Sequence, residues 1–231
     1  SGATLYNCWA ENNESYHEGG GFYLSSGAFA ESCVMKNNYI RMDMGSGFYS
    51  YQGALRNCLS TGNGTGTYAD GGGGCAYGGS VLDCVIIGNT AQDAGGGLSI
   101  EPGATILNTE IRNNTAAIGG GFYANGWSPA ITVSNCVVRN NDASSDGGGI
   151  WTERALSLID CTIADNESDE HGGGIYTYHG FAATRTVISN NTSVLQGGGI
   201  YTEDRIHLVN CILTDNTAGG DGGAICLWDS G

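Results

Sequence analysis

Basic residues are scarce in this sequence. Its 231 residues include eight Lys and Arg against 23 Asp and Glu, which gives a formal net charge of −15. Nucleic acids and anionic lipid surfaces are bound by clustered cations, so neither is an expected partner. Proline is nearly absent as well, with only Pro102 and Pro129, and no Pro-rich segment or charge run divides the chain. We therefore expect one domain over residues 1–231.

Long apolar segments are also missing. No run approaches the roughly 18 apolar residues of a membrane helix, and no basic and apolar leader opens the chain. The repeat described below starts and stops within a coil, without an atypical terminal repeat, whereas solenoids usually carry polar caps. We expect the chain to be a fragment of a longer solenoid, with flanking domains.

Glycine, by contrast, is abundant and regularly placed. Most of the 41 glycines lie in nine clusters, each followed by an apolar residue, which start at Gly19, Gly45, Gly72, Gly95, Gly119, Gly147, Gly172, Gly197 and Gly222. An asparagine recurs at intervals of 25 to 27 residues, at Asn13, Asn38, Asn63, Asn89, Asn114, Asn141, Asn166, Asn191 and Asn216. A fixed period in the twenties indicates a solenoid, in which one supersecondary unit stacks on copies of itself.

Each repeat contains three short stretches in which apolar and polar residues alternate, a pattern typical of strands. In residues 147–171, for example, Ile150 and Thr152 are expected to point inward and Trp151 outward. A polar residue, usually Asn or Asp, precedes an inward column of Cys or Thr and predicts a corner. Three strands and three corners predict an all-β fold: a parallel β-helix of about nine coils of ~25 residues with three sheets, right-handed because parallel crossovers are.

The repeated columns have structural interpretations. Glycines suit a tight corner with positive φ, or a close approach between coils. Stacked asparagines suit an amide ladder, in which each side chain bonds to the one above. Seven of the nine cysteines share the inward column and are expected to be small, buried and reduced: Cys8, Cys33, Cys58, Cys84, Cys136, Cys161 and Cys211.

One outward position carries a row of aromatic residues: Tyr23, Tyr49, Tyr123, Trp151, Tyr176 and Tyr201. Such a row can stack on sugar rings or anchor a protein partner, which makes these six residues the candidate binding site. The alternative is that the rings stack on one another and stabilise the sheet. Ala76 and Ser99 are expected to interrupt the row.

Two glutamates are candidate catalytic residues. Glu153 and Glu203 occupy the same position two coils apart, with Tyr178 between them. Strand spacing places them ~9–10 Å apart, near the upper limit for an inverting glycosidase. No long loop builds a cleft around them, and pairing with Arg154 and Arg205 explains them more simply.

Acidic corners at residues 142–146 and 167–170 and at Asp221 are conceivable Ca²⁺ ligands. The Gly-Gly-x-Gly-x-Asp nonapeptide of calcium-binding β-helices is not present. We therefore expect dispersed surface charge here, with neither a metal nor a cofactor.

The paired motifs resemble a known family of repeats. Gly-Gly-x-[Ile/Leu/Phe] is followed later in the coil by apolar-x-x-Asn, as at Ile86–Asn89, Ile111–Asn114, Ile163–Asn166 and Leu213–Asn216. This pattern resembles the polymorphic outer-membrane protein repeats, which belong to bacterial surface adhesins of the right-handed, pectin-lyase-like β-helix class. It differs in that only Ala224 matches the family's Ala in the glycine motif, and the Phe that opens the family's second motif is missing.

The resemblance implies a function. It suggests a non-catalytic module of a larger exported protein, at the cell surface or secreted, which acts as an adhesin or as a structural spacer. The implied partners are a host-surface protein or a glycan. The alternative is a polysaccharide-degrading enzyme of the same β-helix class, a glycoside hydrolase or lyase that uses Glu153 and Glu203.

Overall fold

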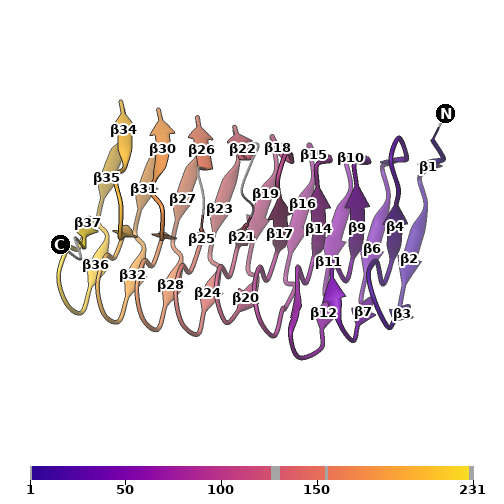
Figure 1. Ribbon diagram of the computed structural model, residues 1–231, viewed down its shortest axis with the longest axis horizontal. Coiled ribbons are helices and arrows are strands. Elements are labelled where there is room, and N and C mark those ends of the chain that lie inside the picture. The colour runs from indigo at the N-terminus through magenta and orange to yellow at the C-terminus, as the bar shows by residue number, and fades with distance from the viewer. Residues whose placement is uncertain (1, 126–130, 154–155, 229–231) are drawn as a thin grey trace.

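The chain forms a stack of coils along one axis, with the two ends of the chain at opposite ends of the stack (Figure 1). The structure is a computed structural model that describes residues 2–125, 131–153 and 156–228. Within these ranges the chain contains strands and turns and no helix, and so none that is long and apolar enough to cross a membrane. Each coil passes through three long parallel sheets, which we call sheets I, II and III.

Sheet I opens each coil and has nine strands. They are β1 (Thr4–Tyr6), β5 (Phe29–Glu31), β10 (Ala54–Arg56), β15 (Ser80–Leu82), β18 (Thr105–Leu107), β22 (Ile131–Ser134), β26 (Leu156–Ile159), β30 (Phe181–Thr184) and β34 (His207–Val209). Sheet II follows after one corner, also with nine strands. They are β2 (Trp9–Glu11), β6 (Val34–Lys36), β11 (Leu59–Thr61), β16 (Val85–Ile87), β19 (Glu110–Arg112), β23 (Val137–Arg139), β27 (Thr162–Ala164), β31 (Val187–Ser189) and β35 (Ile212–Thr214).

Sheet III closes each coil and again has nine strands. They are β4 (Phe22–Leu24), β9 (Phe48–Tyr51), β14 (Gly74–Tyr77), β17 (Leu98–Glu101), β21 (Phe122–Ala124), β25 (Ile150–Thr152), β29 (Ile175–Thr177), β33 (Ile200–Thr202) and β37 (Ile225–Leu227). Very short strands pair between sheets II and III: β3 (Glu14–Ser15), β7 (Tyr39–Ile40), β12 (Gly64–Thr65), β8 (Asp43–Met44), β13 (Ala69–Asp70), β20 (Thr115–Ala116), β24 (Asp142–Ala143), β28 (Glu167–Ser168), β32 (Thr192–Ser193) and β36 (Thr217–Ala218). The three long sheets match the predicted architecture, and the short strands are additional.

Residues with left-handed backbone angles form the corners. The corner between sheets I and II lies at the predicted position before the cysteine column, with φ of 50° to 54° at Asn7, Ser32, Asn57, Asp83, Asn108, Asn135, Asp160, Arg185 and Asn210. A corner that was not predicted lies directly before the asparagine column, as at Asn113 and Asp165. Asn and Asp tolerate this region better than other residues with side chains, which explains why they predominate at both corners.

The glycine clusters have both expected roles. Gly147 turns the chain into sheet III with a φ of 69°, where a side chain would be strained. The next residue, Gly148, packs so tightly against the neighbouring coil that a Cβ would overlap the carbonyl oxygen of Glu167. The glycines therefore let successive coils approach at the entry to sheet III.

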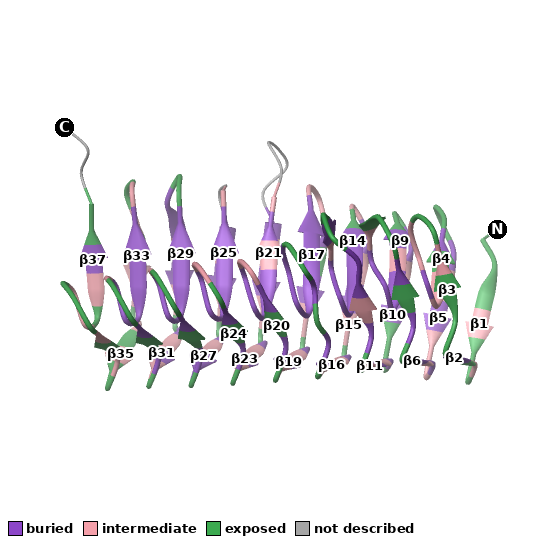
Figure 2. Ribbon diagram, turned by 90° about the horizontal axis from the view of Figure 1, so that it is seen from below, coloured by how far each residue is buried: buried purple, intermediate pink, exposed green. Residues whose placement is uncertain are grey.

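A continuous apolar core fills the inside of the coils. It contains inward side chains of all three long sheets, among them the fully buried Phe48 and Phe122. Figure 2 shows the strands of sheet III as mostly buried along the middle of the stack. Each coil completes this core only together with its neighbours, as expected for a solenoid.

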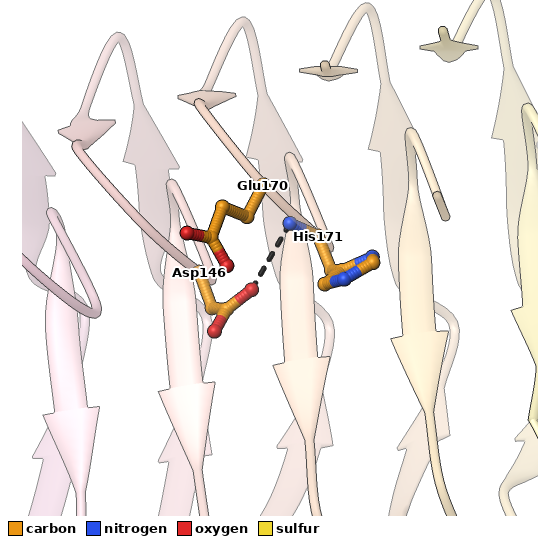
Figure 3. Close-up of side chains that lie close together, drawn as sticks. All are labelled: Asp146, Glu170 and His171. Carbon is orange, nitrogen blue, oxygen red and sulfur yellow. Dashed lines mark hydrogen bonds between the residues drawn. The ribbon is translucent and has the colours of Figure 1, made fainter. Parts of the chain in front are cut away.

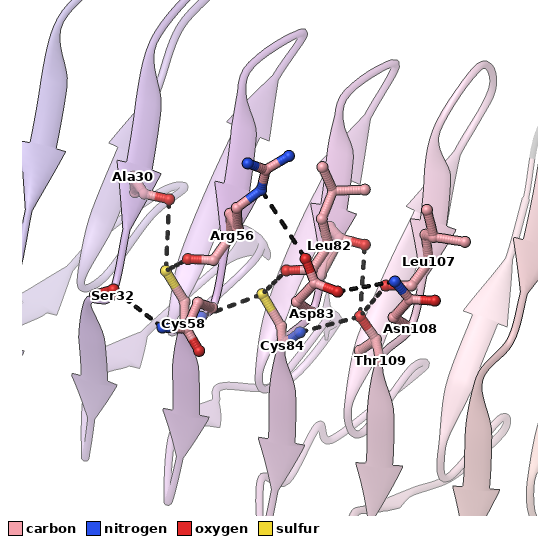
Figure 4. A network of polar contacts seen from close by, with 12 residues as sticks. Ala30, Ser32, Arg56, Cys58, Leu82, Asp83, Cys84, Leu107, Asn108 and Thr109 are labelled. Carbon is pink, nitrogen blue, oxygen red and sulfur yellow. Dashed lines mark hydrogen bonds and ion pairs between the residues drawn. The ribbon is translucent and has the colours of Figure 1, made fainter.

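The inward cysteine column is a chain of hydrogen bonds. The backbone N–H of Cys58 donates to Cys84 Sγ at 3.4 Å, and the N–H of Cys84 donates to Thr109 Oγ1 at 3.3 Å (Figure 4). The Cys84 thiol and the Thr109 hydroxyl each donate to the carbonyl two residues earlier. Cys and Thr are therefore interchangeable here because both are small groups that accept one bond and donate another.

We expect two buried thiols of this column, those of Cys136 and Cys161, to react slowly. All nine cysteines are free, and burial raises the pKa of the Cys136 thiol to about 12 and also raises that of Cys161. Because the thiolate is the reactive form, a disulfide reagent should label these two thiols in the native protein far more slowly than after unfolding. Mass spectrometry of timed samples measures this. Native labelling as fast as in the unfolded chain, or a disulfide between neighbouring coils, would contradict the prediction.

Candidate functional site

The outer face of sheet III carries the predicted aromatic row in register. Tyr23 pairs with Tyr49, Trp151 with Tyr176, and Tyr176 with Tyr201. The interruption lies at Cys75 and Ser99, which are direct partners in the sheet. The expectation of Ala76 at this position is wrong by one residue, because Ala76 points inward and is fully buried.

The outward position lies one residue earlier than expected because this coil has a fourth glycine. Gly74 takes the inward place that an apolar residue fills elsewhere, and a Cβ there would overlap the ring of Phe48. The Phe48 ring thus fills the space above Gly74, and Cys75 becomes the outward residue. Cys75 Sγ contacts Met44 Sδ at 3.8 Å.

The C-terminal part of the row is buried. Trp151, Tyr176 and Tyr201 are 9%, 7% and 6% exposed. Their ring centroids lie 5.7 Å apart for the first pair and 5.2 Å for the second, with nearly parallel planes. His171 packs on Tyr201 with ring centroids 4.6 Å apart, and Ile118 packs against the same cluster. These three rings stack on one another. This is the alternative interpretation of the row, in which the rings stabilise the sheet.

The N-terminal part of the face is different, because four tyrosines there are accessible. Tyr23, Tyr51 and Tyr77 are 57%, 41% and 38% exposed, and Tyr49 is half-buried. Tyr23 stacks on Tyr49 and Tyr51 stacks on Tyr77, both with ring centroids 5.3 Å apart. Since Tyr51 follows Tyr49 by two residues on β9, the two pairs lie side by side on one face. We call these four residues the tyrosine platform.

Tyr51 and Tyr77 were not among the residues predicted from the sequence. They occupy the second outward position of β9 and β14, two residues after the aromatic row. The signal that reveals them is the alternation itself: residues i and i+2 of a strand share a face. Tyr51 and Tyr77 thus add a second column of rings beside the aromatic row, in two consecutive coils.

Two carboxyl groups lie at the interruption of the row. Glu101 is the residue in register with Tyr77 and is only 6% exposed. Burial raises the pKa of Glu101 to about 7, and the neighbouring carboxylates of Asp70 and Glu153 add to the shift. Burial also raises the pKa of Asp70 to about 6, although the N–H of Ala94 donates to its Oδ1 at 3.0 Å.

The same place holds polar atoms that lack partners. Glu101 Oε1 and Ser99 Oγ are buried and have no hydrogen-bond partner among the described residues. Cys75 and Ser99, which stand in the aromatic row here, are themselves fully buried. Asp70 and Glu101 are thus two carboxyl groups with raised pKa values, and we call them the Asp70–Glu101 pair.

The predicted catalytic glutamates do not form such a pair. Backbone bonds from Tyr178 N to Thr152 O and from Glu203 N to Thr177 O place Tyr178 between the two glutamates along the stack. The hydroxyl of Tyr176 donates to Glu203 Oε1 at 2.6 Å. Arg205 makes no ion pair with Glu203 in the described part of the chain, contrary to expectation, and Arg154 lies outside the described residues.

One group of side chains has the spacing of a cation site. Potential ligand atoms of Asp146, Glu170 and His171 lie within 4.8 Å of one another (Figure 3). The backbone N–H of His171 donates to Asp146 Oδ1 at 3.0 Å, and burial raises the pKa of Asp146. These three residues would be the ligands if a divalent cation bound here. The backbone bond and the stacking of His171 on Tyr201 explain their positions without an ion.

Comparison with known proteins agrees with this geometry. Residues 75–231 match the family model described as the right handed beta helix region. The chain belongs to this family. No curated protein and no solved structure matches the chain. Membership confirms the right-handed parallel β-helix expected from the sequence.

Proposed function

We propose that this β-helix is a non-catalytic module of an exported protein that binds uncharged glycans through the tyrosine platform. The exposure of Tyr23, Tyr51 and Tyr77 is the observation that carries the proposal. Tyrosine combines an apolar ring with a hydroxyl, which suits the alternating C–H and hydroxyl surfaces of a sugar. The resemblance to surface adhesins supports a location at the cell surface or in the secreted fraction.

The negative charge of the protein favours neutral glycans over polyanionic ones as ligands. The chain carries a net charge of −15, and the Asp70–Glu101 pair adjoins the platform. Polyanionic glycans would be repelled by this surface, whereas neutral sugars avoid that cost. Because the rings of each pair stack on each other, the ring faces between the partners are covered, and a glycan would meet ring edges, hydroxyls and the outer faces of the pairs.

Removing two platform rings should abolish most of the binding. Each ring lost from such a contact typically weakens binding by about 1–2 kcal/mol, so Tyr51→Ser with Tyr77→Ser should raise Kd by roughly tenfold or more. Binding is measured on immobilised neutral polysaccharides and by calorimetry with the oligosaccharide that binds best. The melting temperature should change little, since both side chains are accessible.

The matched control is Tyr6→Ser. Tyr6 is exposed at the same end of the stack but lies on sheet I. This variant should bind as the wild type does. Equal losses in both variants, or the failure of every neutral glycan to bind the wild type, would contradict the proposal and leave the spacer function.

A second candidate function is cleavage of a polysaccharide, and the Asp70–Glu101 pair favours it. A carboxyl group with a pKa of about 7 can serve as a general acid near neutral pH, with a second carboxylate beside it. The test is product release from neutral and uronate polysaccharides between pH 5 and pH 8. Turnover that is lost in Glu101→Gln and retained in Glu203→Gln would establish an enzyme at this pair. Turnover lost only in Glu153→Gln or Glu203→Gln would favour the pair predicted from the sequence.

A further inference from the structure

A cavity of about 580 Å³ lies on another part of the molecule, at the N-terminal ends of three neighbouring strands of sheet I. These strands are β26, β30 and β34, which lie side by side in Figure 1. The volume falls within the range of small-molecule sites. Its lining includes apolar residues and nitrogen-bearing residues: Leu156, Phe181, Ile206, His179, Arg205 and His207.

Arg205 is unusual among the cations of this chain. Of its eight Lys and Arg, Arg154 lies outside the described residues, which leaves seven. Six of the seven form ion pairs with Asp or Glu: Lys36, Arg41, Arg56, Arg112, Arg139 and Arg185. Arg205 alone has none within the described ranges. Arg205 thus differs from the other six cations in having no acidic partner among the described residues, and a guanidinium of this kind can pair with an external anion.

The surroundings of Arg205 support that role. Among the described residues no Asp or Glu lines this cavity, and His179 and His207 both line it. The nearest acidic side chain in sequence, Asp204, accepts a hydrogen bond from the Arg205 backbone N–H at 2.6 Å. Asp204 and Glu203 line a neighbouring cavity, which shares Arg205 and Ile206 with this one.

Two of the apolar residues that line the cavity belong to the core. Phe181 and Leu156 belong to the continuous core and are almost fully buried. They lie at the start of β30 and β26, and these strands are paired. Apolar residues and a planar guanidinium in one cavity fit a ligand with two parts, an apolar body and a compact anionic group.

We propose that this cavity binds an organic monocarboxylate. The carboxylate pairs with Arg205 in the two-pronged geometry that guanidinium favours, and His179 and His207 supply further hydrogen bonds. The apolar body lies against Phe181, Leu156 and Ile206. This site is independent of the tyrosine platform, which lies on sheet III at the other end of the stack.

The proposal is tested by calorimetry with the whole chain and 3-phenylpropionate as the probe. We expect measurable binding of the carboxylate and at least about tenfold weaker binding of 3-phenylpropionamide, which has the same body without the charge. Arg205→Gln should weaken carboxylate binding by a similar factor. The matched control is Arg185→Gln, which removes an exposed arginine outside the cavity and should leave the affinity unchanged.

The outcomes separate this site from the platform. Tyr51→Ser with Tyr77→Ser should retain carboxylate binding, so failure of one proposal leaves the other standing. No binding of 3-phenylpropionate to the wild type would overturn the site, as would undiminished binding to a folded Arg205→Gln variant. Equal affinity for inorganic sulfate or phosphate would overturn the assignment to a carboxylate.

Discussion

Replacing Asn114 by Ala is expected to destabilise the fold by on the order of 3–5 kcal/mol, because the change leaves several buried groups unpaired. Asn114 is fully buried. Its Oδ1 accepts bonds from the backbone N–H of Asn89 at 2.9 Å and from Asn89 Nδ2 at 3.1 Å. Its Nδ2 donates to the carbonyl of Ile86 at 3.1 Å and to Asn141 Oδ1 at 3.0 Å. One side chain therefore satisfies partners in the coils on both sides of its own.

The control is the same substitution at an accessible position of the ladder. Asn13 is exposed, and its backbone N–H and Nδ2 both donate to Asn38 Oδ1, where water can replace them. Asn13→Ala should therefore cost less than about 1 kcal/mol. Urea denaturation gives both values, provided that the slope of the transition is unchanged. An equal loss of unfolding free energy in the two variants would show that the buried hydrogen bonds of the ladder add no stability of their own.

Replacing Glu101 by Gln is expected to stabilise the protein at pH 8 by up to about 3 kcal/mol. The folded pKa of Glu101 is raised from 4.5 to about 7, so its ionised form is disfavoured in the fold. The stabilising contribution of the protonated carboxyl is fully present below pH 4.5 and is lost as the pH rises through 7. Asp70, with a folded pKa of about 6, contributes with the same sign.

Carboxylates that pair with arginines have the opposite effect and lower the stability at low pH. Arg139 and Arg112 lower the pKa of Glu110 against the effect of its partial burial, so the stability from this carboxylate is lost as the pH falls through its folded pKa. We therefore expect the wild type to be most stable in mildly acid solution. Denaturation measured from pH 5 to pH 8 should give a falling curve for the wild type and a flatter one for Glu101→Gln.

The control for this experiment is Glu167→Gln, which changes an exposed glutamate on β28. Its curve should run parallel to that of the wild type. A Glu101→Gln curve that coincides with the wild-type curve would show that Glu101 is not buried as the structure places it.

The sequence predicts the scaffold well because every coil repeats the same physical requirements. The amide ladder, the corners before the cysteine column and the glycine contacts each depend on a residue type that recurs about every 25 residues. Gly74 shows where periodicity is insufficient. Four consecutive glycines offer two equally good alignments, and only the packing of the Phe48 ring decides between them.

The candidate site is less predictable, because alternation specifies the face of a residue and not its exposure. Trp151 and Tyr23 hold equivalent outward positions, yet one is 9% and the other 57% exposed. The difference comes from neighbours in adjacent coils, such as His171 lying over Tyr201. Glu101 and Tyr77 likewise hold equivalent positions, yet Glu101 is 6% and Tyr77 38% exposed.

The most direct test of the proposed function observes the tyrosine rings while a glycan binds. Aromatic ring signals of the protein are followed by NMR during titration with the neutral oligosaccharide that binds best. We predict shifts at Tyr23, Tyr51 and Tyr77, with the buried rings of Tyr176 and Tyr201 unchanged. Shifts confined to residues outside the tyrosine platform, or no shifts with any neutral oligosaccharide, would contradict the assignment of this face as the binding site.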